Sequence, residues 1–305
     1  MKKIAATVVT YNRKKLLLDN IKELLSQTAY DQMDIIIVDN ASTDGTREAL
    51  EEYIQAGQII YQNTGANTGA SGGFCYSAKY AAEMGYEYVW MMDDDCMPTP
   101  TALEKLLEAA AEIGEDYGFV SSKVLWTDGT PCLMNIQGET MYRPVRDFTS
   151  KQVVVATATF VSLFIPIKVI KDIGVPIKEF FIWSDDWEFT RRMSLKYKCY
   201  LINDSVVIHK MTSNIGSNIA KDTIERLNRY SFMYRNEFYV WRREGIKGLC
   251  RYSIRVIAHI VRVLLYAKDY KWQRIKCILK SVYKGLSFNP PIEYVNTVKA
   301  NKLLQ

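Results

Sequence analysis

Residues 34–46 read DIIIVDNASTDGT. The segment 34–38 is dominated by an apolar, β-branched run that predicts a buried strand, and the Asn, Ser, Asp and Gly residues after it predict a turn. The same order recurs in residues 4–12, which read IAATVVTYN, and in residues 86–95, which read YEYVWMMDDD. Each of three predicted strands therefore ends in a polar segment.

The segments between these strands predict helices. Residues 13–27 place apolar side chains at a helical spacing, and 46–55 and 75–84 also read as helices, with a short strand at 59–61. Further along we expect a helix over 99–113 and strands over 119–125, within 153–166 and over 200–208. Strands that alternate with helices of about 10–15 residues imply βαβ units. We therefore predict an α/β fold, with a mostly parallel sheet and helices on both faces.

The polar strand ends predict where a ligand binds. In open α/β sheets, ligands lie beyond the carboxyl ends of the strands. These ends are TYN (10–12), VDN (38–40) and MMDDD (91–95). We expect all three to meet at one edge of the sheet.

Composition sets the class of protein. The chain has 305 residues, of which 48% are hydrophobic and 24% are charged, as in an ordinary globular protein with a sizeable core. The six cysteines form no CxxC pair, so we expect neither a zinc ribbon nor a disulfide framework, and a reducing cytosol fits best. The apolar run after the N-terminal lysines is too short for a signal peptide and fits a first strand.

The charge is divided unevenly along the chain. Residues 226–285 carry 15 Lys and Arg against 3 Asp and Glu, whereas residues 1–225 carry 22 against 30. This helical, basic and aromatic region favours an anionic partner surface. Its apolar stretch 253–267 is interrupted by Arg255, His259 and Arg262, so we expect it to lie on a membrane rather than to cross one. Packing on the rest of the chain or on a second subunit is the alternative.

Asp93, Asp94 and Asp95 are the strongest chemical signal in the sequence. Adjacent carboxylates repel one another, and a hard divalent cation together with sugar hydroxyls would relieve that repulsion. Alternate residues of an extended segment point the same way, so Asp93 and Asp95 are placed to share one ligand. The alternative is a solvated acidic turn that caps the next helix.

Other segments have a structural and a functional interpretation each. Asp39 after its strand is placed to accept hydrogen bonds from a base or ribose, or it forms an Asx turn. The Gly-rich segment NTGASGGF (67–74) either lets backbone N–H groups approach an anion or is a flexible turn. His209, at a strand end, is a candidate third metal ligand or a structural histidine.

The segment WSDDWE (183–188) is a second acidic cluster. Tryptophan faces and carboxylates together suit a sugar, and one carboxylate of the pair is placed to act as a general base. Acidic residues that open a helix also complement its dipole, and the tryptophans also fit a core.

Taken together and in this order, TVVTYNR, IIIVDNASTDGT, NTGASGGF, VWMMDDD, FFIWSDDWEFTRR and VIH resemble family 2 glycosyltransferases with the GT-A fold, over about residues 4–240. FFIWSDDWEF and MYRNEFYVWRR look like the branch with galactofuranosyl- and rhamnosyltransferases of bacterial surface polysaccharides. The resemblance implies a catalytic domain over 1–222, with a nucleotide-sugar half over about 1–98 and an acceptor half over about 99–222. The region 223–305 follows as basic helices for which we expect contact with a membrane.

The resemblance also implies roles for individual residues. Asp186 would be the catalytic base, and Mn²⁺ or Mg²⁺ would be held by Asp93, Asp95 and His209. The acceptor would meet Trp183, Asp185 and Trp187. The donor would be bound by the following residues: Thr10, Asn12, Arg13, Asp39, Asn67, Gly69, Gly72, Gly73 and Asp94.

The implied reaction is an inverting transfer, with UDP-galactofuranose as the first choice of donor and dTDP-rhamnose or a UDP-pyranose as alternatives. The implied acceptor is a saccharide or lipid-linked saccharide of capsule, exopolysaccharide or O-antigen synthesis. We expect a cytoplasmic enzyme, peripheral on the inner face of the bacterial membrane and capable of forming a homo-oligomer.

Two other classes of protein fit less well. A nucleic-acid-binding protein would use the basic region but would not need the acidic clusters, so we expect no nucleic-acid partner. A Rossmann-type dehydrogenase would require G-x-G-x-x-G after the first strand, where this chain has TYNRKK.

Overall fold

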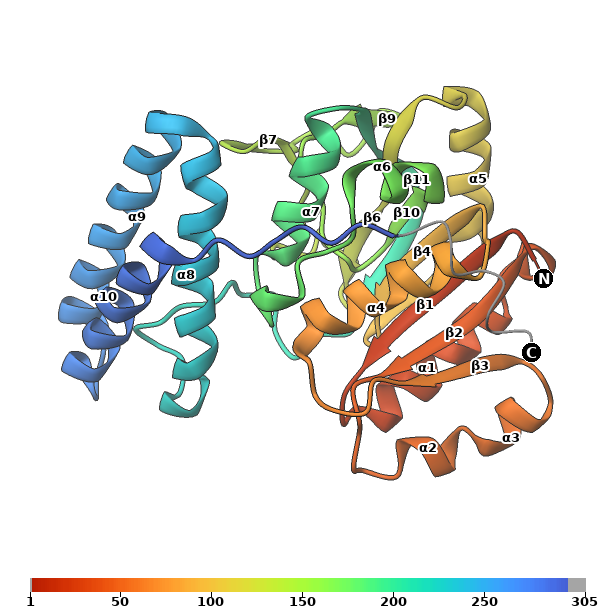
Figure 1. The fold of residues 1–305 in the computed structure, drawn as a ribbon, viewed down its shortest axis with the longest axis horizontal. Helices are drawn as coiled ribbons and strands as arrows, with labels where there is room; N and C mark the ends of the chain where they lie inside the picture. Colours follow the sequence, from red (N-terminus) through yellow and green to blue (C-terminus); the bar gives the residue numbers. More distant parts are fainter. Residues whose placement is uncertain (1, 296–305) are drawn as a thin grey trace.

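A computed structural model describes residues 2–295 of the chain. Its main element is a nine-stranded sheet in the order β3-β2-β1-β4-β10-β6-β11-β5, in which β9 also pairs with β11 (Figure 1). The strands of this sheet are β1 (Ile4–Thr10), β2 (Met33–Asp39), β3 (Ile59–Asn63), β4 (Tyr88–Asp93), β5 (Cys96–Pro98), β6 (Tyr117–Trp126), β9 (Gln152–Val154), β10 (Leu163–Pro166) and β11 (Lys198–His209). A separate hairpin joins β7 (Gly138–Thr140) to β8 (Arg143–Pro144).

The sheet is mixed. Strands β3, β2, β1 and β4 are parallel, as the βαβ pattern predicted. Strand β10, however, runs antiparallel to β4 and β6, and β5 and β9 run antiparallel to β11. The described connection from β6 to β10 contains no helix, whereas a parallel neighbour needs a long crossover, usually helical. The parallel expectation therefore holds for β3, β2, β1 and β4 and for the pair β6 and β11, which are parallel as well.

Helices cover both faces of the sheet, as predicted (Figure 1). One face buries Leu17, Ile21 and Leu103 from α1 (Lys14–Leu25) and α5 (Ala102–Ile113). The other face buries apolar residues of α4 (Gly69–Glu83), α6 (Ile167–Ile173) and α7 (Asp185–Ser194). The short helices are α2 (Thr46–Ala49), α3 (Glu51–Gln55), η1 (Tyr30–Gln32) and η2 (Lys178–Phe180).

Three differences from the predicted boundaries bear on the site. The expected helix over 46–55 is divided into α2 and α3, and His209 is the last residue of β11 rather than the residue after it. Helix α4 begins at Gly69, not at residue 75. A side chain at Gly73 would collide with Val9 of β1, so glycine here lets the helix lie close to the strand, and the segment predicted as a loop is the first part of the helix.

Beyond β11 the chain forms α8 (Leu227–Arg243), α9 (Gly245–Tyr266) and α10 (Lys271–Ser287), preceded by η3 (Ile224–Arg226). These helices enclose a cluster of their own that includes Tyr230, Tyr234, Trp241, Tyr252 and Ile278. Among the helices of residues 2–295, none is long and apolar enough to cross a membrane. The last part of the expected region, 296–305, lies outside the described residues.

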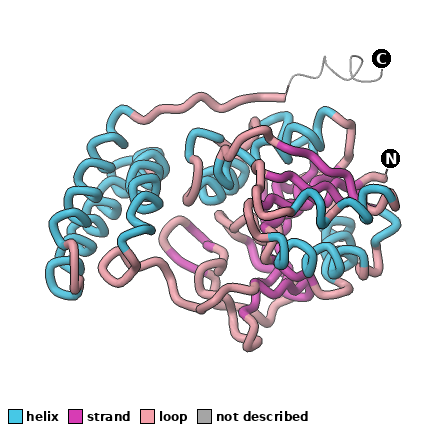
Figure 2. Tube along the Cα trace, turned by 90° about the horizontal axis from the view of Figure 1, so that it is seen from below, coloured by secondary structure: helices cyan, strands magenta, loops and turns pink. Residues whose placement is uncertain are grey.

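After α10 the chain returns along the sheet-bearing part of the molecule (Figure 2). The carbonyl oxygen of Glu293 accepts a hydrogen bond of 2.9 Å from the backbone N–H of Val175, and its carboxylate pairs with Lys79 of α4. The helical region is thus attached to the sheet-bearing part at both of its ends.

Candidate active site

The carboxyl ends of β1, β2 and β4 lie side by side, as the sequence predicted. In the register of the sheet, Thr10 is opposite Asp39, and Val9 is opposite Asp93. The polar segments after these strands therefore meet at one edge of the sheet.

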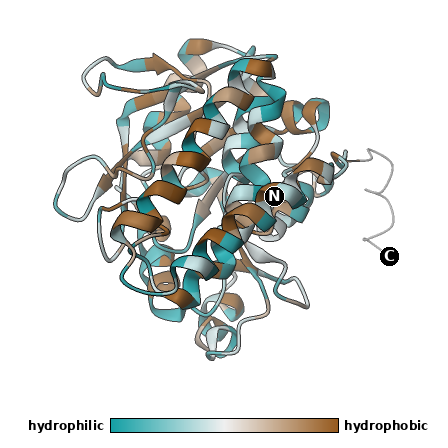
Figure 3. Ribbon diagram, turned by 90° about the vertical axis from the view of Figure 1, so that its left-hand side faces the viewer, coloured by the Kyte–Doolittle hydropathy of each residue, from teal (hydrophilic) through white to brown (hydrophobic). Residues whose placement is uncertain are grey.

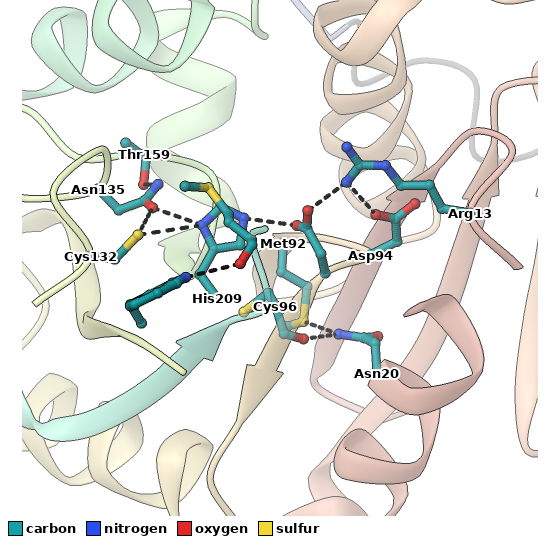
Figure 4. A network of polar contacts seen from close by, with 12 residues as sticks. Arg13, Asn20, Met92, Asp94, Cys96, Cys132, Asn135, Thr159 and His209 are labelled. Carbon is teal, nitrogen blue, oxygen red and sulfur yellow. Dashed lines mark hydrogen bonds and ion pairs between the residues drawn. The ribbon is translucent and has the colours of Figure 1, made fainter. Parts of the chain in front are cut away.

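Asp94 is held by the segment that follows β1. The Thr10 hydroxyl donates to Asp94 Oδ2 at 2.7 Å. Arg13 Nη1 lies 3.2 Å from Asp94 Oδ1 and 2.5 Å from Asp95 Oδ2 (Figure 4). Burial raises the pKa of Asp94 to about 6, although the charge of Arg13 acts against that rise. Thr10, Arg13 and Asp94, all predicted to bind the nucleotide-sugar donor, thus form one cluster, in which Thr10 and Asp94 are buried and Arg13 is partly exposed.

Asp95 leads into a chain of polar contacts that continues through His209 to Asn135 (Figure 4). Its Oδ1 lies 2.9 Å from His209 Nε2, and His209 Nδ1 lies 2.8 Å from Asn135 Oδ1. Asn135 is itself fixed, because its amide nitrogen donates to Thr159 and its oxygen accepts from Cys132. Burial disfavours the charged form of His209, but the hydrogen bonds with Asp95 and Cys132 and the charges of Asp95 and Asp93 together outweigh it and raise the pKa to about 10. Asp95 and His209 are brought together as the sequence predicted.

The carboxylate of Asp93, at the end of β4, accepts no hydrogen bond from a side chain in the described part of the chain. Burial and the charge of Asp95 raise the pKa of Asp93 to about 7. Two carboxylates and an imidazole are a suitable donor set for Mn²⁺ or Mg²⁺. A neighbour that holds the far nitrogen of a ligating histidine is also usual, and Asn135 occupies that place. The chemistry of these residues therefore fits a divalent cation. Among residues 2–295, however, no three such side chains lie close enough together to form a metal-binding group. Asp95 is instead paired with Arg13 and His209.

Asp39 and Asn12 organise the turn after β2. Asp39 accepts hydrogen bonds from the backbone N–H of Ser42 at 2.9 Å and from the Tyr61 hydroxyl at 2.7 Å. Asn12 has a positive φ of 53°, and its Oδ1 accepts from the N–H of Thr43 at 2.7 Å. Asp39 and Asn12, which were predicted to bind the nucleotide-sugar donor, therefore take part in internal hydrogen bonds at the edge of the sheet.

The Gly-rich segment contacts the residues just before the second acidic cluster. Asn67 Oδ1 accepts a hydrogen bond from the backbone N–H of Gly69 at 2.9 Å. Gly69 has a φ of +74°, and a side chain there would collide with the carbonyl oxygen of Phe181. A side chain at Gly72 would collide with Thr68. Glycine is required here so that the start of α4 approaches the segment before α7.

Asp185 and Asp186 occupy the first turn of α7. Burial, followed by the charges of Asp185 and then Asp93, raises the pKa of Asp186 well above its usual range. The Asp186 carboxylate accepts from the N–H of Trp187 at 2.7 Å. Asp185 is buried, and its Oδ2 has no partner among the described residues. The predicted base is thus close enough to Asp93 for the two charges to interact.

The two tryptophans beside this pair face the helical region. Trp183 makes an edge contact with Tyr230 at 5.2 Å between ring centroids, and both Trp183 and Trp187 pack against the cluster of α8–α10. Their role in acceptor binding stays a prediction.

The sequence analysis missed three residues that organise the site: Tyr61, Asn135 and Asn236. Tyr61 and Asn135 contact Asp39 and His209, as described above, and Asn236 donates to the carbonyl oxygens of residues 180, 182 and 183. Asn236 lies in the segment MYRNEF, where a buried polar residue between aromatic residues was the available signal.

Comparison with known proteins identifies the N-terminal domain. Residues 6–154 match the model of Glycosyl transferase family 2. Galactofuranosyltransferase GlfT1 of Mycobacterium tuberculosis is 26% identical over 273 residues, which cover 81% of this chain and 84% of that protein. GlfT1 of Mycolicibacterium smegmatis is 30% identical over 35% of each chain. The putative teichuronic acid biosynthesis glycosyltransferase TuaG of Bacillus subtilis is 28% identical, over 42% of this chain and 50% of that protein.

Solved structures share the fold. The S. aureus TarS fragment 1–349 in complex with UDP-GlcNAc has a TM-score of 0.54 at 17% identity, covering 95% of this chain and 74% of that one. The mannosyltransferase PcManGT from Pyrobaculum calidifontis, in complex with GDP-Man and Mn²⁺, has a TM-score of 0.55 at 15% identity and covers 95% and 76%. The mixed sheet with its helices is therefore a GT-A fold. The chain spans 35% and 50% of two of the curated relatives and 84% of the third. Residues 6–154, which contain the Asp93–Asp95 triplet, are therefore a glycosyl transferase family 2 domain.

Proposed function

We propose that this protein transfers a sugar from a nucleotide donor to an acceptor hydroxyl with inversion at the anomeric carbon. The observation that carries the proposal is that burial and the charges of Asp185 and Asp93 raise the pKa of Asp186, while Asp93 itself ends β4 at the carboxyl edge of the sheet. In this proposal Asp186 is the general base and the acidic triplet is the site for the donor diphosphate.

In the proposed reaction, the acceptor oxygen forms a bond to the anomeric carbon while the bond from that carbon to the donor phosphate breaks. Asp186 takes the proton of the attacking hydroxyl, and the nucleoside diphosphate leaves with the electron pair of the broken bond. A raised pKa brings a carboxylate base closer to neutral pH, where proton transfer is most effective.

The segment after β1 and the turn after β2 bind the nucleotide in this proposal. Asp39 and Asn12 would face the base and ribose, and Asn67 with Gly69, Gly72 and Gly73 would line the sugar pocket. Asp93, Asp95 and His209 would hold Mn²⁺ or Mg²⁺, which supplies positive charge to the departing diphosphate. Support for a metal comes from this donor set and from the GT-A neighbour that carries Mn²⁺.

UDP-galactofuranose is the donor we propose first. The relative that covers most of the chain is named a galactofuranosyltransferase. The structural neighbour with UDP-GlcNAc supports a UDP-pyranose as the second candidate, and dTDP-rhamnose is the third. A saccharide of a bacterial surface polymer is the proposed acceptor, since TuaG is named for teichuronic acid biosynthesis.

We also propose that α9 and α10 rest on the anionic inner face of the bacterial membrane. Helix α9 exposes a row of apolar side chains opposite its buried face, and α10 exposes a second row. Figure 3 shows hydrophobic residues on this side of the molecule. The rows consist of Ile246, Ile254, Ile257, Val261, Leu264 and Leu265 on α9 and of Trp272, Leu279, Tyr283 and Leu286 on α10.

Charge favours a lipid surface over a second copy of the chain. Residues 245–287 contain ten Lys and Arg against a single acidic residue, Asp269. Arg274 is buried and Arg255 is paired with Glu237, but the other eight basic side chains are exposed. Two copies of this face would repel each other, whereas anionic lipid headgroups attract each exposed basic side chain by about 1 kcal/mol. Exposed apolar rows beside basic rows are the pattern of an interfacial helix.

The proposed activity is tested with purified protein, Mn²⁺ and a panel of UDP-, dTDP- and GDP-sugars, with Asp186→Asn as the paired variant. We expect transfer or hydrolysis of UDP-galactofuranose that falls by about 100-fold or more in the variant, while UDP binding measured by calorimetry is kept. If only dTDP-rhamnose is turned over, it replaces UDP-galactofuranose as the proposed donor. Full activity of Asp186→Asn would overturn the role of the base.

A further inference from the structure

The segment that leads into Asp186 adopts a disfavoured backbone. Phe181, Trp183 and Ser184 have φ angles of 64°, 66° and 67°. Residues with a Cβ seldom occupy this left-handed region, and three of them in a four-residue segment persist only when their surroundings hold them. The position of α7, and of the carboxylates in its first turn, therefore depends on contacts outside the segment.

Asn236 of α8 makes three hydrogen bonds to the backbone of this segment. Its side-chain nitrogen donates to the carbonyl oxygens of Phe180, Ile182 and Trp183 at 3.0, 3.1 and 2.9 Å. The residue has no exposed surface. Arg235 fixes the other end of the amide, since its guanidinium donates to Asn236 Oδ1 at 2.9 Å and to the carbonyl oxygen of Glu179 at 2.6 Å.

The opposite side of the segment is held by the Gly-rich start of α4. The backbone N–H of Ser71 donates to the Phe181 carbonyl oxygen at 3.1 Å. Gly69 leaves space for that oxygen, as described above. The segment 180–184 thus lies between α4, which belongs to the proposed donor pocket, and α8, which belongs to the helical region.

We propose that Asn236 is a positioning residue for the transfer reaction: by holding the backbone of residues 180–183, it sets the place of Asp186 relative to the donor site. This inference rests on the proposed function. It assigns the helical region a part in catalysis that is separate from membrane contact. Because Asn236 donates only to backbone carbonyl oxygens, its hold on the segment does not depend on which side chains residues 180–183 carry.

The test compares Asn236→Asp and Arg235→Gln with Tyr252→Phe in the full chain. Aspartate has the size of asparagine but cannot donate to three carbonyl oxygens. Arg235→Gln is a milder change at a half-buried position, and it serves if the first variant does not fold. Tyr252→Phe is the control, since it removes a buried hydrogen bond of 2.7 Å to Tyr234 within the helical cluster without touching the segment.

We expect Asn236→Asp to lower kcat by about 10- to 100-fold, since a displacement near 1 Å costs this much, while the Kd for UDP with Mn²⁺ stays within about twofold of wild type. Arg235→Gln should lower kcat less, and Tyr252→Phe should leave kcat unchanged. A normal kcat in Asn236→Asp, or a kcat lost together with UDP binding, would overturn the proposal.

Amide hydrogen exchange of residues 178–188 provides a readout that does not require activity. Exchange in this segment should become at least about tenfold faster in Asn236→Asp and stay unchanged in Tyr252→Phe. Faster exchange spread over the whole chain would show general destabilisation and refute a positioning role. If wild-type protein turned over no sugar while the local effect persisted, the hold on the segment would stand and the proposed reaction would fall.

Discussion

The Nε2 atom of His209 lies 2.9 Å from Oδ1 of Asp95, although 114 residues separate the two in the chain. The contact follows from the pairing of β11 with β5, in which His209 is opposite Cys96. Since side chains alternate between the faces of a strand, a register shift of one residue would turn His209 away from Asp95. The short strand β5 therefore determines whether the third proposed metal ligand reaches the acidic triplet.

Replacing Asp95 should reduce the effect of metal on nucleotide binding. With Asp95→Asn, we expect the Kd for UDP in the presence of Mn²⁺ to rise by about 10- to 100-fold, because one charged oxygen ligand is lost. The Kd measured with chelator should change little. Isothermal titration calorimetry with and without Mn²⁺ separates the two, and Asp172→Asn on the surface is the control. A wild-type Kd that does not depend on Mn²⁺ would argue against the metal site.

Asn135→Leu tests the contact behind His209. The amide holds His209 Nδ1 at 2.8 Å, and loss of such a neighbour commonly lowers metal affinity by about 10- to 100-fold. We expect weaker Mn²⁺ binding, measured by calorimetry on the UDP complex, with all three proposed ligands still in place. Unchanged Mn²⁺ affinity would mean that Asn135 has no influence on the metal.

Asp186→Asn should stabilise the fold at neutral pH. Burial and the charges of Asp185 and Asp93 raise the pKa of Asp186 in the folded state, whereas in the unfolded chain it lies near 4. As the pH rises above that unfolded value, the folded state binds more protons, so the stability of the wild type falls until the folded pKa is passed. Asparagine does not ionise and avoids this loss.

The unfolding temperature of the two proteins checks this sign. At pH 7 the variant should melt at a higher temperature than the wild type, and below about pH 4 the two should agree, because the aspartate is then neutral in both states. A variant that melts at the same temperature as the wild type at pH 7 would contradict the raised pKa.

Gly69→Ala should cost more stability than Gly57→Ala. Both glycines have positive φ angles, +74° and +65°, but a side chain at Gly57 has no atom within 4 Å, whereas one at Gly69 collides with Phe181. We expect a loss of about 1 kcal/mol at Gly57 from backbone strain alone and a further 1–3 kcal/mol, roughly, at Gly69 from overpacking. Urea unfolding of both variants measures the difference, and equal losses would mean that Phe181 moves freely.

Exposed apolar residues of α9 should be required for binding to vesicles. The triple variant Ile254→Ser, Ile257→Ser and Leu265→Ser should bind vesicles of phosphatidylcholine and phosphatidylglycerol at least about tenfold more weakly, since each buried CH₂ contributes about 0.8 kcal/mol. Leu195→Ser is the matched control, since Leu195 is 66% exposed, as is Leu265, but follows α7. Flotation of wild type and variants at low salt measures the effect; no flotation of the wild type would refute membrane docking.

The strands and the site edge were predictable because local pattern determines them. The apolar runs before Asp39 and Asp93 are long enough to be buried whichever neighbours they have, and parallel strands place their carboxyl ends together. The antiparallel course of β10 was not predictable in the same way, since it depends on pairing with β4 and β6, which are distant in the chain.

The residues that support the site could not be predicted from the local sequence pattern. Asn135 and Asn236 act through contacts that join residues 74 and at least 53 positions apart, and nothing in their immediate sequence indicates a partner. The early start of α4 was missed for a related reason: glycines disfavour a helix by propensity, and only the closeness of Val9 and Phe181 shows why they occur there.

The return of the chain after α10 bears on how this enzyme can be re-engineered. Glu293 is bonded to Val175 and paired with Lys79, and Lys178 lies 3.8 Å from the same carboxylate. A chimera that replaces the C-terminal helices by those of another transferase would break these contacts. A graft that ends before Glu293 would lose them, so the exchanged unit must include Glu293 and match the surface around Lys79 of α4 and Val175.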